Sequence, residues 1–222
     1  MKNVLIAFEA SGTVCKAFRK RGYNAFSLDI LKTYGDLPQY HIVGNAFNYI
    51  AHGGYFKTET GVCYFVDEWD LVIMHPPCTY LTNANNRWYN AARYGKKALD
   101  RMIFRYCAIA DFLACTECTA KRWAIENPVG IMSTKYRKPD QIYNPYNFKG
   151  ETECKRTCLW LHNLPPLEYT QDVPTEERTH NIFKGYFNGV QYAWNDKRVA
   201  VFRAKTPEGV AEAMSEQWGQ IL

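Results

Sequence analysis

The stretch WDLVIMHPPCTYLTN, residues 69–83, joins an apolar run to two prolines and a cysteine. The run Leu71-Val72-Ile73-Met74 has the length and composition of a buried strand. Pro76 and Pro77 have no N–H group to donate to a neighbouring strand, so the strand must end before them. The sequence therefore predicts a strand that places Cys78 just beyond its carboxyl end.

Similar short apolar runs alternate along the chain with segments of helical spacing. We expect further strands at 4–8, 24–28, 41–43, 122–125 and 156–161, and helices at 14–21, 97–117 and 206–218. Strands that alternate with helices favour a mostly parallel sheet with right-handed crossovers and helices on both faces. We therefore predict a Rossmann-like α/β fold and a single domain over residues 1–222.

Two of the predicted helices have a clear pattern. The helix at 97–117 carries apolar residues at helical spacing, namely Leu99, Met102, Ile103, Tyr106, Ile109, Ala110 and Leu113. In the terminal helix, Thr206 is expected as the N-cap and Pro207 at the first helical position. One face of that helix should pack back on the domain through Val210, Ala213, Met214 and Trp218.

The composition restricts where the protein works. No apolar run approaches the roughly 20 residues that span a bilayer. The N-terminal MKNVLIAFEASG lacks the long apolar segment and cleavage site of a signal peptide, so we expect a cytoplasmic protein without membrane contact. In a reducing compartment the eight cysteines are expected to be buried thiols, metal ligands or nucleophiles rather than disulfides.

The net charge of +5 is unevenly distributed. No acidic residue occurs from Thr79 to Leu99, where basic and aromatic side chains alternate. Such a mixture suits phosphates and base faces, although a solvated surface above packed tyrosines has the same composition. A second stretch of this kind covers residues 135–149.

Chemically notable residues follow five of the predicted strands. These are Phe8 to Gly12, Asp29, Gly44-Asn45, Cys78 and Glu126. In open parallel sheets, ligands bind at the carboxyl ends of the strands. A glycine turn followed about 20 residues later by a carboxylate such as Asp29 favours an adenosine-type ligand, because the carboxylate accepts hydrogen bonds from ribose hydroxyls. We also expect the first turn of the helix at 14–21 to offer free N–H groups.

Cys78 and Glu126 each allow two interpretations. Cys78 is either a small buried side chain or a nucleophile, and the basic stretch after it is expected to lower its pKa. Glu126 is either a helix cap or a general acid and hydrogen-bond partner in a desolvated crevice.

The ordered set FEASG, SLDI, HPPCTYLTNAN, IENP and Lys155-Arg156 resembles the motifs of the DNA cytosine-5 methyltransferases, and especially a compact group of phage and prophage members. The resemblance implies an S-adenosylmethionine-dependent methyltransferase fold, with Cys78 as nucleophile, Glu126 as partner of the cytosine ring and Arg156 in the family's arginine motif. It implies a cofactor site formed by Phe8, Glu9, Ser11, Gly12, Asp29, Ile30, Asn45 and Pro76. DNA contacts are expected from Thr82, Arg87, Trp88, Lys96, Lys97 and Lys155.

Two positions depart from the family's pattern. Thr79 stands where the family usually has glutamine, and Asn45 stands where it has an aspartate near the adenine. Only a short region, about residues 135–198, is left for recognising a target sequence. We therefore expect a relaxed or short recognition sequence, or help from a partner. The sequence leaves the oligomeric state open, with a monomer favoured, and a phage-encoded protein would act in the cytoplasm of its bacterial host.

The implied reaction adds the Cys78 thiolate to carbon 6 of a cytosine that has left the duplex, and transfers a methyl group to carbon 5. A carboxymethyl group from a carboxylated S-adenosylmethionine is the alternative, because a basic residue near the sulfonium could select that donor. An amino-group methyltransferase would need Asn or Asp and an aromatic residue where His75 and Cys78 stand.

Two further alternatives remain open. A thymidylate-synthase-like enzyme would use its cysteine on a free pyrimidine nucleotide with a folate. A non-catalytic zinc module would use Cys115, Cys118, Cys154 and Cys158, whose spacings suit zinc, although we expect no metal.

Overall fold

A computed structural model of the chain provides the fold and describes residues 1–180, 186–187, 190–193 and 196–222. Its centre is a seven-stranded sheet in the order β3-β2-β1-β6-β7-β9-β8. These strands are β1 (Asn3–Ala7), β2 (Asn24–Asp29), β3 (His41–Val43), β6 (Leu71–Met74), β7 (Trp123–Pro128), β8 (Gln141–Tyr143) and β9 (Thr157–His162). Each strand predicted from the sequence is present, with ends that differ by a few residues at most.

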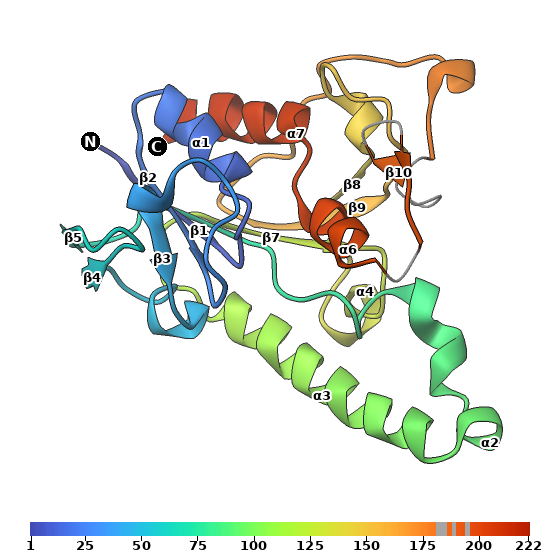
Figure 1. Cartoon of the computed structure of the whole chain (residues 1–222). Helices are drawn as coiled ribbons and strands as arrows, with labels where there is room; N and C mark the ends of the chain where they lie inside the picture. Colours follow the sequence, from blue (N-terminus) through green and yellow to red (C-terminus); the bar gives the residue numbers. More distant parts are fainter. Residues whose placement is uncertain (181–185, 188–189, 194–195) are drawn as a thin grey trace.

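The sheet is mostly parallel. The five strands from β3 to β7 run in one direction, and β9 pairs antiparallel with both β7 and β8. Helices cover both faces of the sheet, as Figure 1 shows. The predicted Rossmann-like α/β fold is therefore confirmed. The strand order reverses between β1 and β6, which is where sheets of this class bind ligands.

The helices form two layers. They are α1 (Thr13–Lys20), α2 (Ala91–Tyr94), α3 (Lys96–Thr116), α4 (Met132–Lys135), α6 (Lys197–Ala204) and α7 (Glu208–Ala213). Val4 and Ile6 of β1 pack in a cluster with α1 and α7, whereas Leu5 and Ala7 pack in a second cluster with α3. Because successive side chains of a strand point to opposite faces, β1 is buried by a helical layer on each side.

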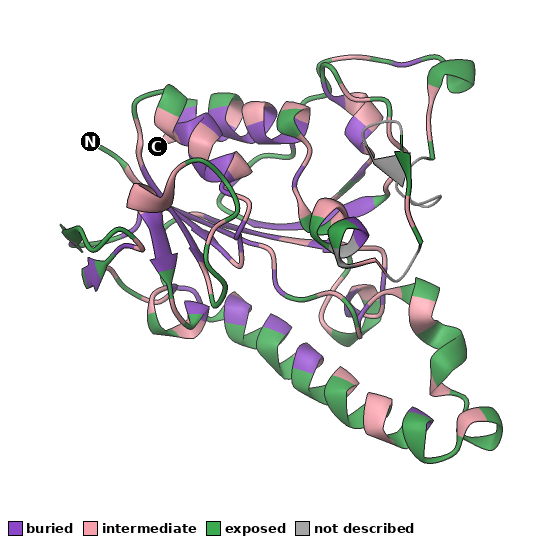
Figure 2. Cartoon of the chain, in the orientation of Figure 1, coloured by how far each residue is buried: buried purple, intermediate pink, exposed green. Residues whose placement is uncertain are grey.

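The helix predicted at 97–117 is present as α3, but most of its regularly spaced apolar residues are exposed, and of that set only Ile109 packs against the core cluster. The buried residues of α3 are Ala98, Ala108, Phe112 and Cys115. Leu99, Ile103 and Tyr106 are exposed on the outer face, which is largely green along this helix in Figure 2. Small side chains on the inner face let α3 lie close to the sheet.

The terminal segment begins one residue later than expected. Pro207 is the N-cap of α7 and no side chain caps the helix, so the assignment of Thr206 as N-cap was wrong. Thr206 is itself buried. The helix continues as a π-helical turn at Met214–Trp218, and the apolar face that includes Val210 and Trp218 is buried beside α1.

Several elements had no clear signal in the sequence. Among them are β8 and the hairpins β4 (Gly54–Lys57) with β5 (Cys63–Val66) and β10 (Tyr186–Phe187) with β11 (Val190–Gln191). The range 135–198, expected to be a recognition region, includes β8 and β9 and thus contributes to the central sheet. Parts of it at 181–185, 188–189 and 194–195 lie outside the described residues.

The two chain ends lie near each other at the amino ends of the central strands (Figure 1). Leu222 and Tyr23, which directly precedes β2, pack against the same buried cluster, and Asn3 begins β1. Among the described residues, none of the helices combines the length and apolar character that a membrane span requires.

Candidate active site

Cys78 and Glu126 are held together at the carboxyl ends of the paired strands β6 and β7. The buried Asn127 donates from Nδ2 to the carbonyl oxygen of Pro76 at 2.8 Å, which joins the proline turn to β7. Further along, Ile131 N donates to Leu81 O at 3.0 Å. The segments that follow the two strands are therefore fixed to each other by direct hydrogen bonds.

Gly130 makes this approach possible. A Cβ atom at this position would lie 2.3 Å from the carbonyl oxygen of Leu81, far inside contact distance. Gly130 also forms an isolated antiparallel bridge with Thr82. Only a residue without a side chain lets the segment after Glu126 approach the segment after Cys78 so closely.

His75 pairs with Glu126 inside the site. The Nδ1 atom of His75 lies 3.0 Å from Oε2 of Glu126, and the His75 side chain is only 10% exposed. Burial alone would raise the pKa of Glu126, but the hydrogen bond and charge of His75, together with Lys155, lower it below its usual value. The Nε2 atom of His75 is buried without a partner among the described residues. The site thus holds an ionised carboxylate beside a buried polar atom that has no hydrogen-bond partner among the described residues.

The expectation that the pKa of Cys78 is lowered was wrong. Burial raises the pKa of the Cys78 thiol, and the Glu126 carboxylate raises it further. The cations that oppose this effect are Lys155 and Arg203, and neither belongs to the basic stretch that follows Cys78. The free protein therefore carries Cys78 as a thiol.

Lys155, rather than Arg156, is the cation whose charge acts on both Cys78 and Glu126. Its Nζ atom donates to the carbonyl oxygen of Arg203 at 2.8 Å, so α6 lies beside the site. Arg156 is exposed, and its charge acts on Cys158. Sequence reasoning missed Arg203, because α6 carries no motif and no marked apolar face.

The turn after β1 is shaped by Glu9. Its buried carboxylate accepts hydrogen bonds from the N–H groups of Val14 at 2.7 Å and Cys15 at 3.3 Å. Ser11 Oγ contacts both Glu9 at 3.3 Å and Thr13 N at 3.4 Å. The expected free N–H groups at the start of α1 are therefore taken by the chain's own side chains. Burial raises the pKa of Glu9, and the charge of His75 and the helix N–H groups act against this.

Three consecutive strand ends meet beside this turn. Phe8 has a left-handed backbone with φ of 62°, and its ring contacts that of Phe47 edge-on at 5.7 Å between centroids. Asn45 Oδ1 accepts from Phe47 N at 3.1 Å, and Gly44 N donates to Asp29 O at 2.9 Å. The residues predicted to bind a cofactor after β1, β2 and β3 are thus brought together.

Ile30 extends from the same edge. It follows Asp29 and is 74% exposed, although its side chain is entirely apolar. Asp29 uses one oxygen, Oδ1, to accept from Leu31 N at 2.9 Å. Gly12, whose φ is 66°, ends the turn between β1 and α1. Pro76 is buried in the segment that joins β6 to Cys78.

The predicted DNA-contact residues between 82 and 97 lie on a projecting segment, residues 79–105, which we name the basic arm. It contains six basic residues and one acidic residue, Asp100. Two arginines stack on tyrosines inside the arm: Arg105 lies 3.4 Å from the ring centre of Tyr89, and Arg101 lies 5.2 Å from that of Tyr80. The arm is therefore an organised structure rather than a loose loop.

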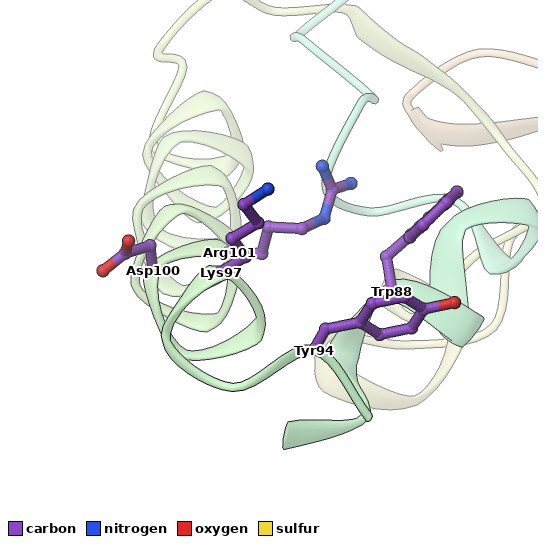
Figure 3. Close-up of a pocket in the computed structure, with 5 residues that line it drawn as sticks. All are labelled: Trp88, Tyr94, Lys97, Asp100 and Arg101. Carbon is purple, nitrogen blue, oxygen red and sulfur yellow. The ribbon is translucent and has the colours of Figure 1, made fainter. Parts of the chain in front are cut away.

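An open pocket of about 520 Å³ lies in the basic arm. Figure 3 shows the residues that line it, namely Trp88, Tyr94, Lys97, Asp100 and Arg101. The Nε atom of Arg101 is buried without a hydrogen-bond partner among the described residues. The pocket thus combines aromatic faces with cations.

The remaining predicted contacts of the arm are placed as follows. Thr82 Oγ1 accepts from Ala84 N at 3.4 Å and so caps the turn that begins the arm. Arg87 lies over the ring of Trp88 at 4.7 Å. Lys96 pairs with Asp100 at 2.8 Å.

The cysteines considered as zinc ligands fall at separate places. Burial and the neighbouring Cys118 raise the pKa of Cys115, while Cys118 donates to Ile50 O at 3.1 Å. Cys158 lies near Glu126, whose charge adds to the effect of burial on its pKa. In the described part of the chain, no three His, Cys, Asp or Glu residues are grouped as metal ligands.

Comparison with known proteins gives a structural similarity. No protein-family model and no curated protein matches the chain. Among solved structures, it is similar to a prophage-encoded protein (E. coli) provisionally named a DNA modification methyltransferase, with a TM-score of 0.37 and 13% identity. The similarity covers 72% of this chain and 46% of that one, so the chain spans about half the length of that protein.

Proposed function

We propose that the chain is an S-adenosylmethionine-dependent DNA cytosine-5 methyltransferase. The observation that carries the proposal is the pairing of Cys78 with Glu126 at adjacent strand ends, joined through Asn127 and accompanied by His75. A thiol and an ionised carboxylate at the edge where ligands bind are the groups that covalent activation of a cytosine ring requires.

The cofactor-side residues fit an adenosine. An apolar side chain as exposed as Ile30 can cover a purine face, Asp29 has a second oxygen for a ribose hydroxyl, and Asn45 can bond an adenine edge. The left-handed Phe8 is the kind of strained backbone that collects at ligand sites. Glu9 acts indirectly, because its hydrogen bonds hold the turn between β1 and α1 in place. When bound, S-adenosylmethionine would supply an electrophilic methyl group.

The chain's own residues then account for activation of the base. The Cys78 sulfur forms a bond to carbon 6, and the electron pair of the carbon 5–carbon 6 double bond becomes available at carbon 5. Glu126 accepts a hydrogen bond from the cytosine amino group. After carbon 5 has gained the transferred group, its proton passes to a water molecule. The electron pair of that carbon–hydrogen bond re-forms the carbon 5–carbon 6 double bond, and the sulfur leaves carbon 6 as a thiolate.

Lys155 takes the cationic role that the resemblance implied for Arg156. It opposes the effect of burial on the pKa of the Cys78 thiol and stabilises the thiolate once the thiol proton has left. His75 keeps Glu126 ionised through the contact of its Nδ1 atom, and its buried Nε2 atom is left without a partner among the described residues. Lys155 and His75 can therefore act on Cys78 and Glu126 even though Cys78 is a thiol before DNA binds.

The basic arm supplies the contact with DNA. Lys97 and Arg101 suit phosphates, and Trp88 and Tyr94 suit the faces of exposed bases. Together with Arg87, Lys96 and the cap residue Thr82, they would hold the strand from which the cytosine has been flipped.

Covalent trapping tests the proposal. DNA containing 5-fluorocytosine carries fluorine in place of the carbon 5 proton, so wild-type protein with S-adenosylmethionine is expected to form a stable adduct. Cys78→Ser should form none, whereas Cys107→Ser, which alters an exposed thiol on the outer side of α3, should form as much as wild type. Failure of the wild-type protein to form the adduct while it binds the cofactor would overturn the proposal.

The same experiment separates the remaining alternatives. The mass of the trapped base distinguishes a methyl group from a carboxymethyl group, for which Lys155 is the available cation. An adduct with free dUMP and a folate, in place of DNA, would instead indicate a thymidylate-synthase-like enzyme.

A further inference from the structure

The outer face of α3 carries a continuous apolar stripe. We define the α3 stripe as Leu99, Ile103, Tyr106, Ala110 and Leu113. Leu99 is 53% exposed, Ile103 62% and Tyr106 66%. Ala110 and Leu113 are exposed as well, and the exposed Met102 lies along the side of the stripe.

The stripe does not contribute to the described core. Residues on the opposite side of α3, such as Phe112 and Cys115, fill the cluster beneath the sheet. Figure 1 shows α3 as a long helix at the boundary of the molecule, with the sheet on one side only. Single exposed apolar residues are ordinary, but a row of them along one helix indicates a contact surface.

The spacing within the stripe specifies the kind of contact. Its residues are separated by four, three, four and three positions, which is the alternation that forms the seam between two helices packed by knobs into holes. At about 1.5 Å per residue, the stripe extends about 20 Å, or four turns. A partner helix is therefore the occupant that fits its shape.

We propose that a second copy of this chain covers the stripe, with the two α3 helices antiparallel, in place of the monomer favoured from the sequence. The ends of α3 carry opposite charges: Lys96 and Lys97 lie in the first turn, with Asp100 paired to Lys96 at 2.8 Å, whereas Asp111 and the C-cap residue Glu117 lie toward the end. An antiparallel pair places the basic end of each copy beside the acidic end of the other. A parallel pair would place like charges together.

Side-chain sizes support the same arrangement. In an antiparallel seam, Tyr106 of one copy packs against the small Ala110 of the other, and Ile103 packs against Leu113. The two-fold axis then passes close to the middle of α3, so the exposed Cys107 residues of the two copies lie near each other. Opposed helix dipoles also favour this orientation.

Sedimentation of the full chain over a range of concentrations tests the dimer. Wild-type protein is expected to form dimers with a micromolar or tighter Kd, and Ile103→Glu should weaken the dimer by at least about tenfold, because it buries an unpaired charge at the seam. Tyr106→Lys should have the same effect, whereas Tyr55→Glu on the β4–β5 hairpin should sediment as wild type. All three side chains are exposed in the single chain, so these substitutions should leave the fold intact.

Charge exchange tests the orientation. Lys96→Glu and Glu117→Lys should each weaken the dimer, and the double variant should recover it, because the pair lies between copies. Weakening by either single variant without recovery in the double variant would contradict the antiparallel arrangement.

Cross-linking gives a second readout. A short bis-maleimide should join two wild-type chains through Cys107, and Cys107→Ser should abolish the product while Cys63→Ser leaves it unchanged. A chain that sediments as a monomer at every concentration, and is not cross-linked, would overturn the proposal. The stripe would then bind a helix of another protein rather than a second copy of this chain. These measurements need neither DNA nor cofactor, so they stand apart from the proposed enzymatic activity.

Discussion

Cys78 illustrates how the immediate surroundings of a residue decide its chemistry. The basic stretch after it in the sequence suggested an activated thiolate, but those cations belong to the projecting arm. In the folded chain the thiol is buried beside Glu126, and both features raise its pKa. The thiol is therefore at rest in the free protein, and deprotonation must accompany binding of the substrate.

Because of this arrangement, Glu126→Gln should have opposite effects on the alkylation of Cys78 and on adduct formation with DNA. Glu126→Gln removes a negative charge near Cys78, so the pKa of the thiol should fall and its alkylation by iodoacetamide at neutral pH should become severalfold faster. The same variant should lose adduct formation with 5-fluorocytosine, because the ring loses its partner. Mass spectrometry of the labelled peptides measures both.

The exposed Cys63 and Cys107 provide the internal reference for alkylation. Their rates should be equal in the two proteins. Slower labelling of Cys78 in the variant would contradict the assigned effect of Glu126.

Among the elements, the short helix α1 depends on the residue that precedes its turn. Glu9 reaches past Gly12 to accept from two N–H groups in the first turn of α1. The Glu9 carboxylate thus caps α1, although Glu9 lies three residues before the N-cap residue Gly12. The Glu9 side chain is buried. The turn that faces the proposed cofactor is fixed before any ligand binds.

Two substitutions separate the hydrogen bonds of Glu9 from its charge. Glu9→Ala leaves the N–H groups of Val14 and Cys15 without their acceptor and should lower the free energy of unfolding by about 1–3 kcal/mol. Glu9→Gln keeps one acceptor. Because burial raises the pKa of Glu9, the native protein holds a proton that the unfolded chain releases, and wild-type stability falls as pH rises through the folded pKa.

The Glu9→Gln variant has no titratable group at this position, so its stability relative to wild type should increase from acid to neutral pH. Urea unfolding of both proteins at several pH values measures this difference. A difference that does not change with pH would show that Glu9 is not the titrating group.

The elements also show what the sequence could and could not predict. The buried strands and α3 were predictable, because apolar runs and helical spacing are local. The direction in which α3 faces was not, since its inner side combines Phe112 with small residues such as Ala98 and Ala108, while several larger apolar residues are exposed on its outer side. Cys78 and Glu126 were singled out by their positions at strand ends, and their role as a site stays a prediction. The pairing with His75 and the approach of Lys155 depend on contacts between distant segments.

On the scale of the whole molecule, charge is concentrated where the basic arm leaves the sheet. Within the arm, Arg105 and Arg101 stack on tyrosines, and the other four cations, Arg87, Arg93, Lys96 and Lys97, are exposed. A positively charged extension beside Cys78 is the arrangement that the proposed binding of a polyanion requires.

Binding of DNA should therefore depend steeply on salt. Lys97→Ala removes one cation from the pocket and should weaken binding while it reduces the slope of log K against log salt by about one. Trp88→Ala should weaken binding by about 1–3 kcal/mol without changing that slope, because stacking releases no counterion. Fluorescence anisotropy of a labelled oligonucleotide measures both quantities.

Lys20→Ala, on the far side of the sheet at the end of α1, serves as the matched charge control. It should leave both affinity and slope unchanged. A slope that responds equally to Lys20→Ala and Lys97→Ala would locate the DNA elsewhere.

The position of the chain ends has a practical consequence. Met1 and Leu222 lie near each other at the amino ends of the strands, whereas Cys78 lies at the carboxyl ends. A module attached at either end would therefore extend away from the edge of the sheet that carries Cys78 and Glu126. If the proposed activity holds, the same geometry suits a fusion to a DNA-targeting protein through a flexible tether, because neither attachment point lies at that edge.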